Sequence, residues 1–361
     1  MAITYFDYVP VLKWRQGEYQ ALLRLRPEQK TAIVPLLEIT PPDFDFELNE
    51  PRRTIDAHLA EFAKRLEAKW EARPALLDAG LLDPAERMIG GTHPLLWLMD
   101  AVRPQGGNLV PVTALERDVG YQDAVRIANQ VDGRGAALRC SLEDASDTDF
   151  EDNVATLLER IDVEIYQLDI LIDLRSPNFE PIDGLAQLMI AVLSGSNVFN
   201  AARSVTILAT AFPASMAEVT PPLAFVRRRE WELYKRLIAL LPQGTRRPAF
   251  GDYAIAAPDL FQGDMRLIKP SATVRYATDD GWVIAKGTNV RDNGFAQYKD
   301  RCKSVVDSGR YLGAAFSMGS DYVDRCRAGK ASTGSLTTWR WVGTNHHIAK
   351  VVHDLASVHG L

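Results

Sequence analysis

The chain has 361 residues, of which 24% are charged and 47% hydrophobic, and its formal net charge is -6 at pH 7. This length allows a large core, and the composition excludes a disordered or fibrous protein. The acidic balance argues against a protein that coats nucleic acid by bulk electrostatics, but it is compatible with a local basic pocket that holds a phosphate.

Cysteine usage and hydropathy indicate the compartment. Cys140, Cys302 and Cys326 are odd in number and have no CxxC spacing, which favours free thiols in a reducing compartment. The first residues, MAITYFDYVPVLKW, lack the basic and long apolar regions of a signal peptide, and the apolar stretch GLAQLMIAVLSG is too short to span a bilayer. We therefore expect a cytoplasmic protein with no membrane contact.

One pattern recurs between residues 8 and 255: a short apolar run ends in a polar residue, and a loop and a helical stretch follow. The eight runs are YVPVLKW (8–14), AIVPLLEI (32–39), PALLDAG (74–80), NLVPVTAL (108–115), GAALRCSL (135–142), QLDILIDL (167–174), SVTILATAF (204–212) and RPAFGDYAI (247–255). Most runs are apolar on successive residues, which is typical of parallel strands buried on both faces. The intervening segments, such as 54–70 and 150–161, have apolar residues at helical spacing.

Eight strand-helix units in about 250 residues match the size of a TIM-like (β/α)8 barrel, whereas an open doubly wound sheet more often has five or six. The sequence therefore predicts an α/β fold with a barrel over residues 1–255. After residue 256 the rhythm changes to a hairpin over 265–287, with its turn at Asp280 and Gly281, and then to helical stretches. We interpret residues 256–361 as an α+β extension packed on the barrel.

Polar residues stand where the runs end, and in such a barrel these ends meet at one rim that carries the catalytic groups. The strand-end residues are Lys13, Glu38, Asp78, Thr113, Arg139, Asp173 with Arg175, Thr210, and Asp252 with Tyr253. Asp169 shares a face with Asp173 but lies deeper in its strand, so we interpret it as a buried acid with a partner. Full charges rarely enter a core unpaired, and the predicted ring therefore indicates a functional pocket.

The chemistry of this ring follows from its residue types. Asp78, Asp173 and Asp252, with Glu38, supply oxygen ligands for a divalent cation such as Mg²⁺ or Mn²⁺, or a general base. Lys13, Arg139 and Arg175 supply positive charge for a phosphate or carboxylate. The alternative is that these groups pair only with one another and bind no ligand.

Three of the six histidines fall within TNHHIAKVVHD near the end of the chain. Asn345 is a plausible N-cap, with His346 and His347 at the start of a helix, where adjacent residues point about 100° apart and do not chelate one ion. No zinc motif accompanies them. One histidine can serve as an acid or base only if the extension folds over the barrel mouth. The alternative is a structural role.

The segments YVPVLKWRQGEYQAL, IVPLLEI, FGDYAI and TTWRWVGTNHHI together resemble the beta-protein family of tailed bacteriophages and scattered bacterial genomes. The resemblance spans nearly the whole chain and implies a phage, prophage or phage-defence gene with a protein partner from a neighbouring gene, but it implies no particular reaction. It adds Glu18 and Tyr19 to the candidates. The positions that carry it are Lys13, Glu18, Tyr19, Glu38, Asp252, Tyr253, His346 and His347. Glu18 and Tyr19 either reach the mouth or serve the first helix, as a first-turn acid and a packing residue.

Two hypotheses follow. The first is a metal-dependent phosphodiesterase or nuclease-like hydrolase that acts on a phosphate-bearing substrate, a nucleotide or a nucleic-acid end. Its catalytic residues would be Asp78, Asp173, Asp252, Glu38 and His346, and its substrate-binding residues Lys13, Arg139, Arg175, Tyr253, Glu18, Tyr19 and His347. The second hypothesis is a non-catalytic module that senses a phage component or nucleotide and signals to a partner protein.

Overall fold

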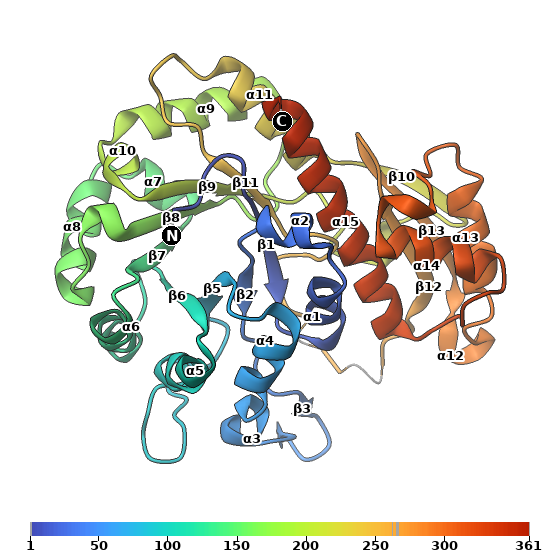
Figure 1. The fold of residues 1–361 in the computed structure, drawn as a ribbon, viewed down its shortest axis with the longest axis horizontal. Helices are drawn as coiled ribbons and strands as arrows, with labels where there is room; N and C mark the ends of the chain where they lie inside the picture. Colours follow the sequence, from blue (N-terminus) through green and yellow to red (C-terminus); the bar gives the residue numbers. More distant parts are fainter. Residues whose placement is uncertain (1, 262, 265–266, 361) are drawn as a thin grey trace.

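The computed structural model of the protein describes residues 2–261, 263–264 and 267–360, and its central feature is a closed barrel of eight parallel strands (Figure 1). The strands follow the order β1-β11-β9-β8-β7-β6-β5-β2 around the barrel. They are β1 (Tyr8–Lys13), β2 (Leu36–Glu38), β5 (Pro74–Asp78), β6 (Asn108–Thr113), β7 (Ala136–Cys140), β8 (Leu168–Asp173), β9 (Ser204–Leu208) and β11 (Ala249–Asp252). Each predicted run contains one of these strands, so the predicted (β/α)8 barrel is confirmed.

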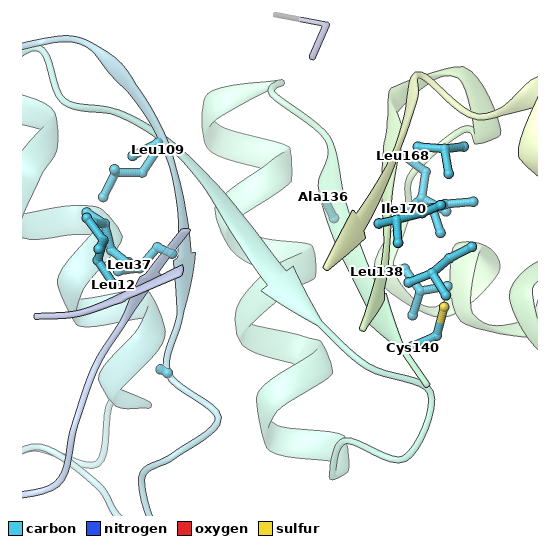
Figure 2. Close-up of a cluster of buried hydrophobic side chains, with 14 of the residues drawn as sticks. Leu12, Leu37, Leu109, Ala136, Leu138, Cys140, Leu168 and Ile170 are labelled. Atoms are coloured by element: carbon cyan, nitrogen blue, oxygen red, sulfur yellow. The ribbon is translucent and has the colours of Figure 1, made fainter. Parts of the chain in front are cut away.

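Side chains alternate between the inside and the outside of the barrel along each strand. On β8, Leu171 belongs to the apolar cluster inside the barrel, whereas Ile170 and Ile172 belong to the layer between the strands and the helices. Figure 2 shows part of this outer layer, with Leu138 and Ile170 among its labelled side chains. This alternation decides which strand-end residues face the barrel mouth.

Helices surround the barrel on its outer face (Figure 1). They are α1 (Gln16–Leu23), α2 (Pro27–Thr31), α3 (Ile55–Leu59), α4 (Phe62–Trp70), α5 (Pro94–Val102), α6 (Val119–Asp132), α7 (Leu142–Ser146), α8 (Phe150–Ile161), α9 (Ile182–Gly195), α10 (Val198–Ala201) and α11 (Arg229–Leu240). The predicted helix over 150–161 is confirmed as α8, whereas the predicted helix over 54–70 divides into α3 and α4. Thr54 caps α3 by accepting a hydrogen bond from the Ala57 amide.

The extension consists of a three-stranded sheet in the order β10-β13-β12 and the helices that cover it. Its elements are β10 (Leu223–Arg227), β12 (Ser271–Ala277), β13 (Gly281–Asn289), α12 (Val290–Asn293), α13 (Tyr298–Val306), α14 (Met318–Arg327) and α15 (Leu336–His359). The predicted hairpin is present as β12 and β13, which pair antiparallel. The third strand, β10, comes from the connection between β9 and α11, within the sequence range predicted for the barrel alone.

The last helix, α15, belongs to both parts of the molecule and runs between them (Figure 1). Ile348, Val351 and Leu355 pack in the main barrel core, while Trp339 and Val342 pack in the core of the extension. The helix lies against α1 and β1, where the helix that follows the eighth strand of a barrel is expected. Apart from β10, the strands and helices of the extension before α15 therefore lie in the chain between the eighth barrel strand, β11, and its helix, α15.

Candidate active site at the barrel mouth

Five charged strand-end residues point into the barrel at its carboxyl-terminal mouth. Each of them lies two residues after an inward-facing residue of its strand, as Lys13 lies after Val11 and Arg139 after Ala137. The five are Lys13, Glu38, Asp78, Arg139 and Asp173, and all are predicted site residues. The structure therefore brings together most of the predicted ring, drawn from β1, β2, β5, β7 and β8.

Arg139 is the centre of this group. Its Nη1 donates to Glu38 Oε1 at 2.8 Å and to Asp78 Oδ2 at 2.9 Å, and its Nε donates to Asp173 Oδ2 at 2.9 Å. Its Nη2 lies 2.7 Å from both Tyr253 Oη and Asp173 Oδ2. Burial alone would disfavour the charged guanidinium, but Tyr253 and the three carboxylates raise the Arg139 pKa well above its usual value. Arg139 thus stays charged and its donors are occupied.

Tyr253 closes the deep side of the mouth. Its hydroxyl donates to Asp173 Oδ2 at 2.5 Å. Burial is the largest cause that raises the Tyr253 pKa, and Asp173 and Glu38 add to the rise while Arg139 opposes it. The phenol therefore keeps its proton, as its role as a hydrogen-bond donor to Asp173 requires.

Lys13 connects the mouth to the loop that follows β11. Its Nζ lies 3.4 Å from Glu38 Oε2 and donates to the carbonyl oxygens of Ala257 and Pro258, each at 3.0 Å. The lysine is buried, and its charge is balanced by the carboxylate and by these two carbonyls. Lys13 therefore orients the loop wall of the mouth.

Arg117 is a mouth residue that the sequence analysis missed. Its Nη2 lies 3.5 Å from Asp78 Oδ1, its Nη1 donates to the Gly80 carbonyl at 3.2 Å, and its guanidinium lies over the Tyr121 ring. A Cβ on Gly80 would lie 1.9 Å from Arg117 Nη2, so the glycine provides the room for this arginine. Arg117 follows the end of β6 by four residues, beyond the strand-end positions that were considered.

An open cleft with a volume of about 1320 Å³ lies at the mouth, and Glu38, Asp78, Arg139 and Asp173 form its charged floor. Its walls come from the loop after β2, which carries the short strands β3 (Phe44–Asp45) and β4 (Glu50–Pro51), and from the loop after β11. The described charged residues that line the cleft are the bases Arg15, Arg52, Arg117, Arg139 and Arg175, and the acids Glu38, Asp43, Asp78, Glu116, Asp144, Asp173, Asp259 and Asp264. The aromatic side chains on its walls are Phe44, Phe46 and Phe261.

Two non-glycine residues at this rim adopt left-handed backbone conformations. Arg175 has φ 55° and Ala254 has φ 53°. The Arg175 amide donates to Asp173 Oδ1 at 2.9 Å, and its guanidinium pairs with Asp259 across the cleft wall. The Ala254 amide donates to Asp252 Oδ1 at 2.7 Å. Such conformations cost of order 1–3 kcal/mol each and concentrate at functional sites.

Asp252 lies away from the mouth, although it was predicted at the rim. It shares the outward face of β11 with Phe250, while Tyr253 points into the barrel. Its Oδ1 accepts from Tyr8 Oη at 2.5 Å and its Oδ2 contacts His347 Nε2 at 2.8 Å. Burial would raise the Asp252 pKa, but His347, Tyr8 and Arg228 hold it below its usual value. Adjacent strand residues face opposite sides, so Asp252 and Tyr253 cannot share one pocket.

His347 joins the extension to the barrel and does not reach the cleft. Trp282 Nε1 donates to its Nδ1 at 3.2 Å, so its Nε2 carries the proton that Asp252 accepts. The imidazole also stacks on the Trp282 ring, with centroids 5.9 Å apart. His347 is completely buried, and its contacts indicate a role in fixing α15.

His346 lies inside the extension. Its Nδ1 lies 3.1 Å from both Ser317 Oγ and Ser320 Oγ, and its Nε2 lies 2.8 Å from the Ala277 carbonyl. The imidazole stacks on Tyr276 with centroids 3.8 Å apart. The predicted helix start at Asn345 is wrong, because α15 begins nine residues earlier, at Leu336, and all three residues lie in its buried middle.

The remaining candidates lie beside the mouth. Glu18 is in the first turn of α1 and is buried. Burial raises the Glu18 pKa, and Arg340, Lys13 and Arg15 oppose the rise. Tyr19 packs on Trp14 with centroids 5.4 Å apart. Neither residue is among those that line the cleft.

Asp169 faces the opposite end of the barrel. It pairs with Arg203, whose Nη2 lies 2.7 Å from Asp169 Oδ2, and it accepts from Ser204 Oγ at 2.6 Å. The prediction of a buried acid with a partner is therefore confirmed. The predicted set Asp78, Asp173 and Asp252 does not converge, and within the described ranges no three His, Cys, Asp or Glu residues form a group that could hold a metal ion.

We expect stability to fall in acid because His346 is neutral in the folded protein. Burial, with smaller contributions from His347, Lys350 and Arg228, lowers the His346 pKa from 6.5 to about 3, although the hydrogen bond to the Ala277 carbonyl opposes the fall. Between these values the unfolded chain binds a proton that the folded protein does not, so this residue's contribution falls as the pH drops below about 6.5, by about 1.4 kcal/mol per pH unit. Urea unfolding at pH values from 7 to 4.5 measures this. The free energy of unfolding should fall less steeply with decreasing pH in His346→Gln than in the wild-type protein. Equal pH dependence in the two proteins would contradict a neutral His346 in the folded state.

The fold and the site together define a (β/α)8 barrel protein with a charged cleft at the carboxyl-terminal rim. The chain belongs to the Beta protein family, whose family model matches residues 8–353. A search of curated proteins gives no match. Within the residues that the structure covers, no helix is long and apolar enough to cross a membrane.

Solved structures with a similar arrangement include two enzymes. Triosephosphate isomerase from Bartonella henselae has 10% sequence identity and a TM-score of 0.35, and the match covers 69% of this chain and 93% of that chain. The active domain 2 of a thermostable chitinase from Pyrococcus furiosus has 9% identity and a TM-score of 0.37, with 70% and 84% covered. At these values the likeness says nothing about substrate or reaction.

Proposed function

We propose that the protein is an enzyme of phage or phage-defence context that hydrolyses or transfers a phosphate group of a nucleotide or nucleic-acid end bound in the cleft. The observation that carries the proposal is the cluster of three buried carboxylates, Glu38, Asp78 and Asp173, around the partly buried Arg139, under an open cleft at the barrel mouth. Charges at such a depth are costly, and the carboxyl-terminal rim is where barrel enzymes place their reacting groups.

The phosphate is assigned to the arginines of the rim. Arg139 already donates to three carboxylates and a tyrosine, so it serves to hold the floor. Arg15 and Arg175 are exposed and line the cleft, and the partner of Arg175, Asp259, is itself 81% exposed. An exposed pair of this kind is weak and exchanges readily for a phosphate.

The chemical step is assigned to the carboxylates of the floor. Asp78 and Glu38 contact the same guanidinium nitrogen and face the cleft, where either can accept a proton from an attacking water or hydroxyl. Because Arg139 binds all three carboxylates, a Mg²⁺ or Mn²⁺ ion would have to enter on the substrate's phosphate instead of occupying a resident site.

A non-catalytic sensor is the second candidate, and the complete pairing of Arg139 favours it. A floor whose charges already neutralise one another suits ligand recognition without turnover. The extension would then pass the signal to a partner protein, because Asp252 contacts His347 of α15 and precedes Tyr253 of the mouth.

Calorimetry and product analysis with mononucleotides and short oligonucleotides test both candidates. Arg15→Ala and Arg175→Ala should each weaken binding on the order of tenfold, and added salt should weaken it further. Arg325→Ala is the control, because Arg325 lies on the surface of α14 and pairs only weakly with Asp321. Product formed by the wild-type protein but not by Asp78→Asn supports the enzyme. Binding without product supports the sensor, and no binding to the wild-type protein overturns both.

A further inference from the structure

The cleft has an aromatic wall that phosphate binding alone does not explain. Phe44 and Phe46 stand on the β3-β4 loop with 40% and 45% of their surface exposed, and their rings meet edge to face with centroids 5.1 Å apart. Phe261, on the loop after β11, is 64% exposed and lines the same cleft. Exposed rings that gather in a concave site are typical of a surface that stacks flat apolar groups.

The size of the cleft points to a ligand larger than one nucleotide. Its volume of about 1320 Å³ exceeds the range of about 300–1,000 Å³ that is usual for small-molecule sites. Aromatic side chains from two separate loops line it, so two flat groups can be held at once.

The charge of the cleft limits the number of phosphates. Among its described lining residues are eight acids and five arginines, and Arg139 is occupied by the floor. Several phosphates lying inside the cleft would be repelled by this excess of carboxylates, whereas one or two phosphates can be held by Arg15 and Arg175. The ligand should therefore combine flat groups with few phosphates.

We propose that the cleft binds a dinucleoside phosphate, with one base on Phe44 and Phe46, the other near Phe261, and the linking phosphate at Arg15 and Arg175. This inference rests on the proposed function and names the substrate class of the same site. The chemistry is shared by a free dinucleotide and by the last two nucleotides of a single strand.

Equilibrium binding of four probes to the full chain tests this proposal: inorganic phosphate, a mononucleotide, a linear dinucleotide and a single-stranded 12-mer. The dinucleotide should bind at least about tenfold more tightly than the mononucleotide, as expected for one additional stacked base. If the 12-mer binds as tightly as the dinucleotide, the ligand is the end of a single strand. If the 12-mer binds more weakly, the ligand is the free dinucleotide.

Variants of the same loop provide the control. Phe46→Ala should remove most of the preference for the dinucleotide, whereas Leu48→Ala should leave it unchanged, because Leu48 is exposed on this loop but is not among the described residues that line the cleft. Equal affinity for mononucleotide and dinucleotide, or an unchanged preference in Phe46→Ala, overturns the dinucleotide assignment and leaves the proposed function standing. Failure of all four probes to bind overturns the proposed function itself.

Discussion

Arg139→Met should destabilise the protein by about 3–5 kcal/mol at pH 7, because it removes the cation that three buried carboxylates share, and the remaining cations Lys13 and Arg117 lie only beside Glu38 and Asp78. The substitution keeps an unbranched apolar stem but removes the guanidinium, and with it the contacts to Glu38, Asp78 and Asp173. The three acids should then bind protons more readily in the folded variant than in the unfolded chain, so the loss should shrink as the pH is lowered toward 5. Urea unfolding followed by circular dichroism at the two pH values measures this.

The matched control for this prediction is Arg325→Met. Arg325 pairs with Asp321 one turn away on the surface of α14, and such pairs contribute less than about 1 kcal/mol. A loss in Arg139→Met that is no larger than in Arg325→Met, or that is the same at both pH values, would show that the carboxylates do not depend on Arg139.

His347→Leu should cost about 3 kcal/mol, because it leaves the buried Asp252 carboxylate without one of its donors. In the double variant with Asp252→Asn the loss should be smaller than the sum of the two single losses. An amide at position 252 still accepts from Tyr8 and from the Ala254 amide through its oxygen, and it carries no uncompensated charge. Unfolding of the four proteins measures this coupling.

His353→Leu is the control for this cycle, since His353 lies on the same helix with 62% of its side chain exposed. It should change the free energy of unfolding by less than about 0.5 kcal/mol. Strictly additive losses at Asp252 and His347 would contradict the direct contact between them.

Strand β11 connects the mouth to the interface between the barrel and the extension. Asp252 and Tyr253 are neighbours on this strand, and they face the extension and the mouth respectively. Arg228 is fully buried at this interface, and its Nη1 donates to Asp354 Oδ2 at 2.7 Å. This contact holds α15 against the start of α11. The His347→Leu variant is therefore expected to weaken ligand binding at the mouth as well as stability.

The barrel and its charged floor were predictable because strand periodicity is a local property. The apolar runs located all eight barrel strands, and the polar residues at their ends gave Lys13, Arg139 and Asp173, each of which lies two residues after an inward apolar position. The same alternation, applied to the last strand, would have separated Asp252 from Tyr253. A polar residue at a strand end thus indicated a residue of the mouth only where it also lies on the inward face of its strand.

Other features depend on contacts that the sequence does not carry locally. The strand β10 is stabilised by pairing with β13, more than fifty residues further along the chain. The helix α15 is buried through its middle because it lies between two cores, so His346 and His347 became interior residues. Phe44 and Phe46 were missed, although both stand in the segment that follows the predicted run 32–39, because their exposure at the cleft is known only from the structure.

The most direct test of the account is a crystal structure of the protein soaked with tungstate, whose anomalous signal locates a phosphate-like anion. If the barrel mouth holds a phosphate site, tungstate should lie in the cleft, within hydrogen-bond distance of Arg15 or Arg175 and above the carboxylates of the floor. Tungstate bound elsewhere, with an empty cleft at concentrations that saturate the other site, would contradict a phosphate site at the barrel mouth.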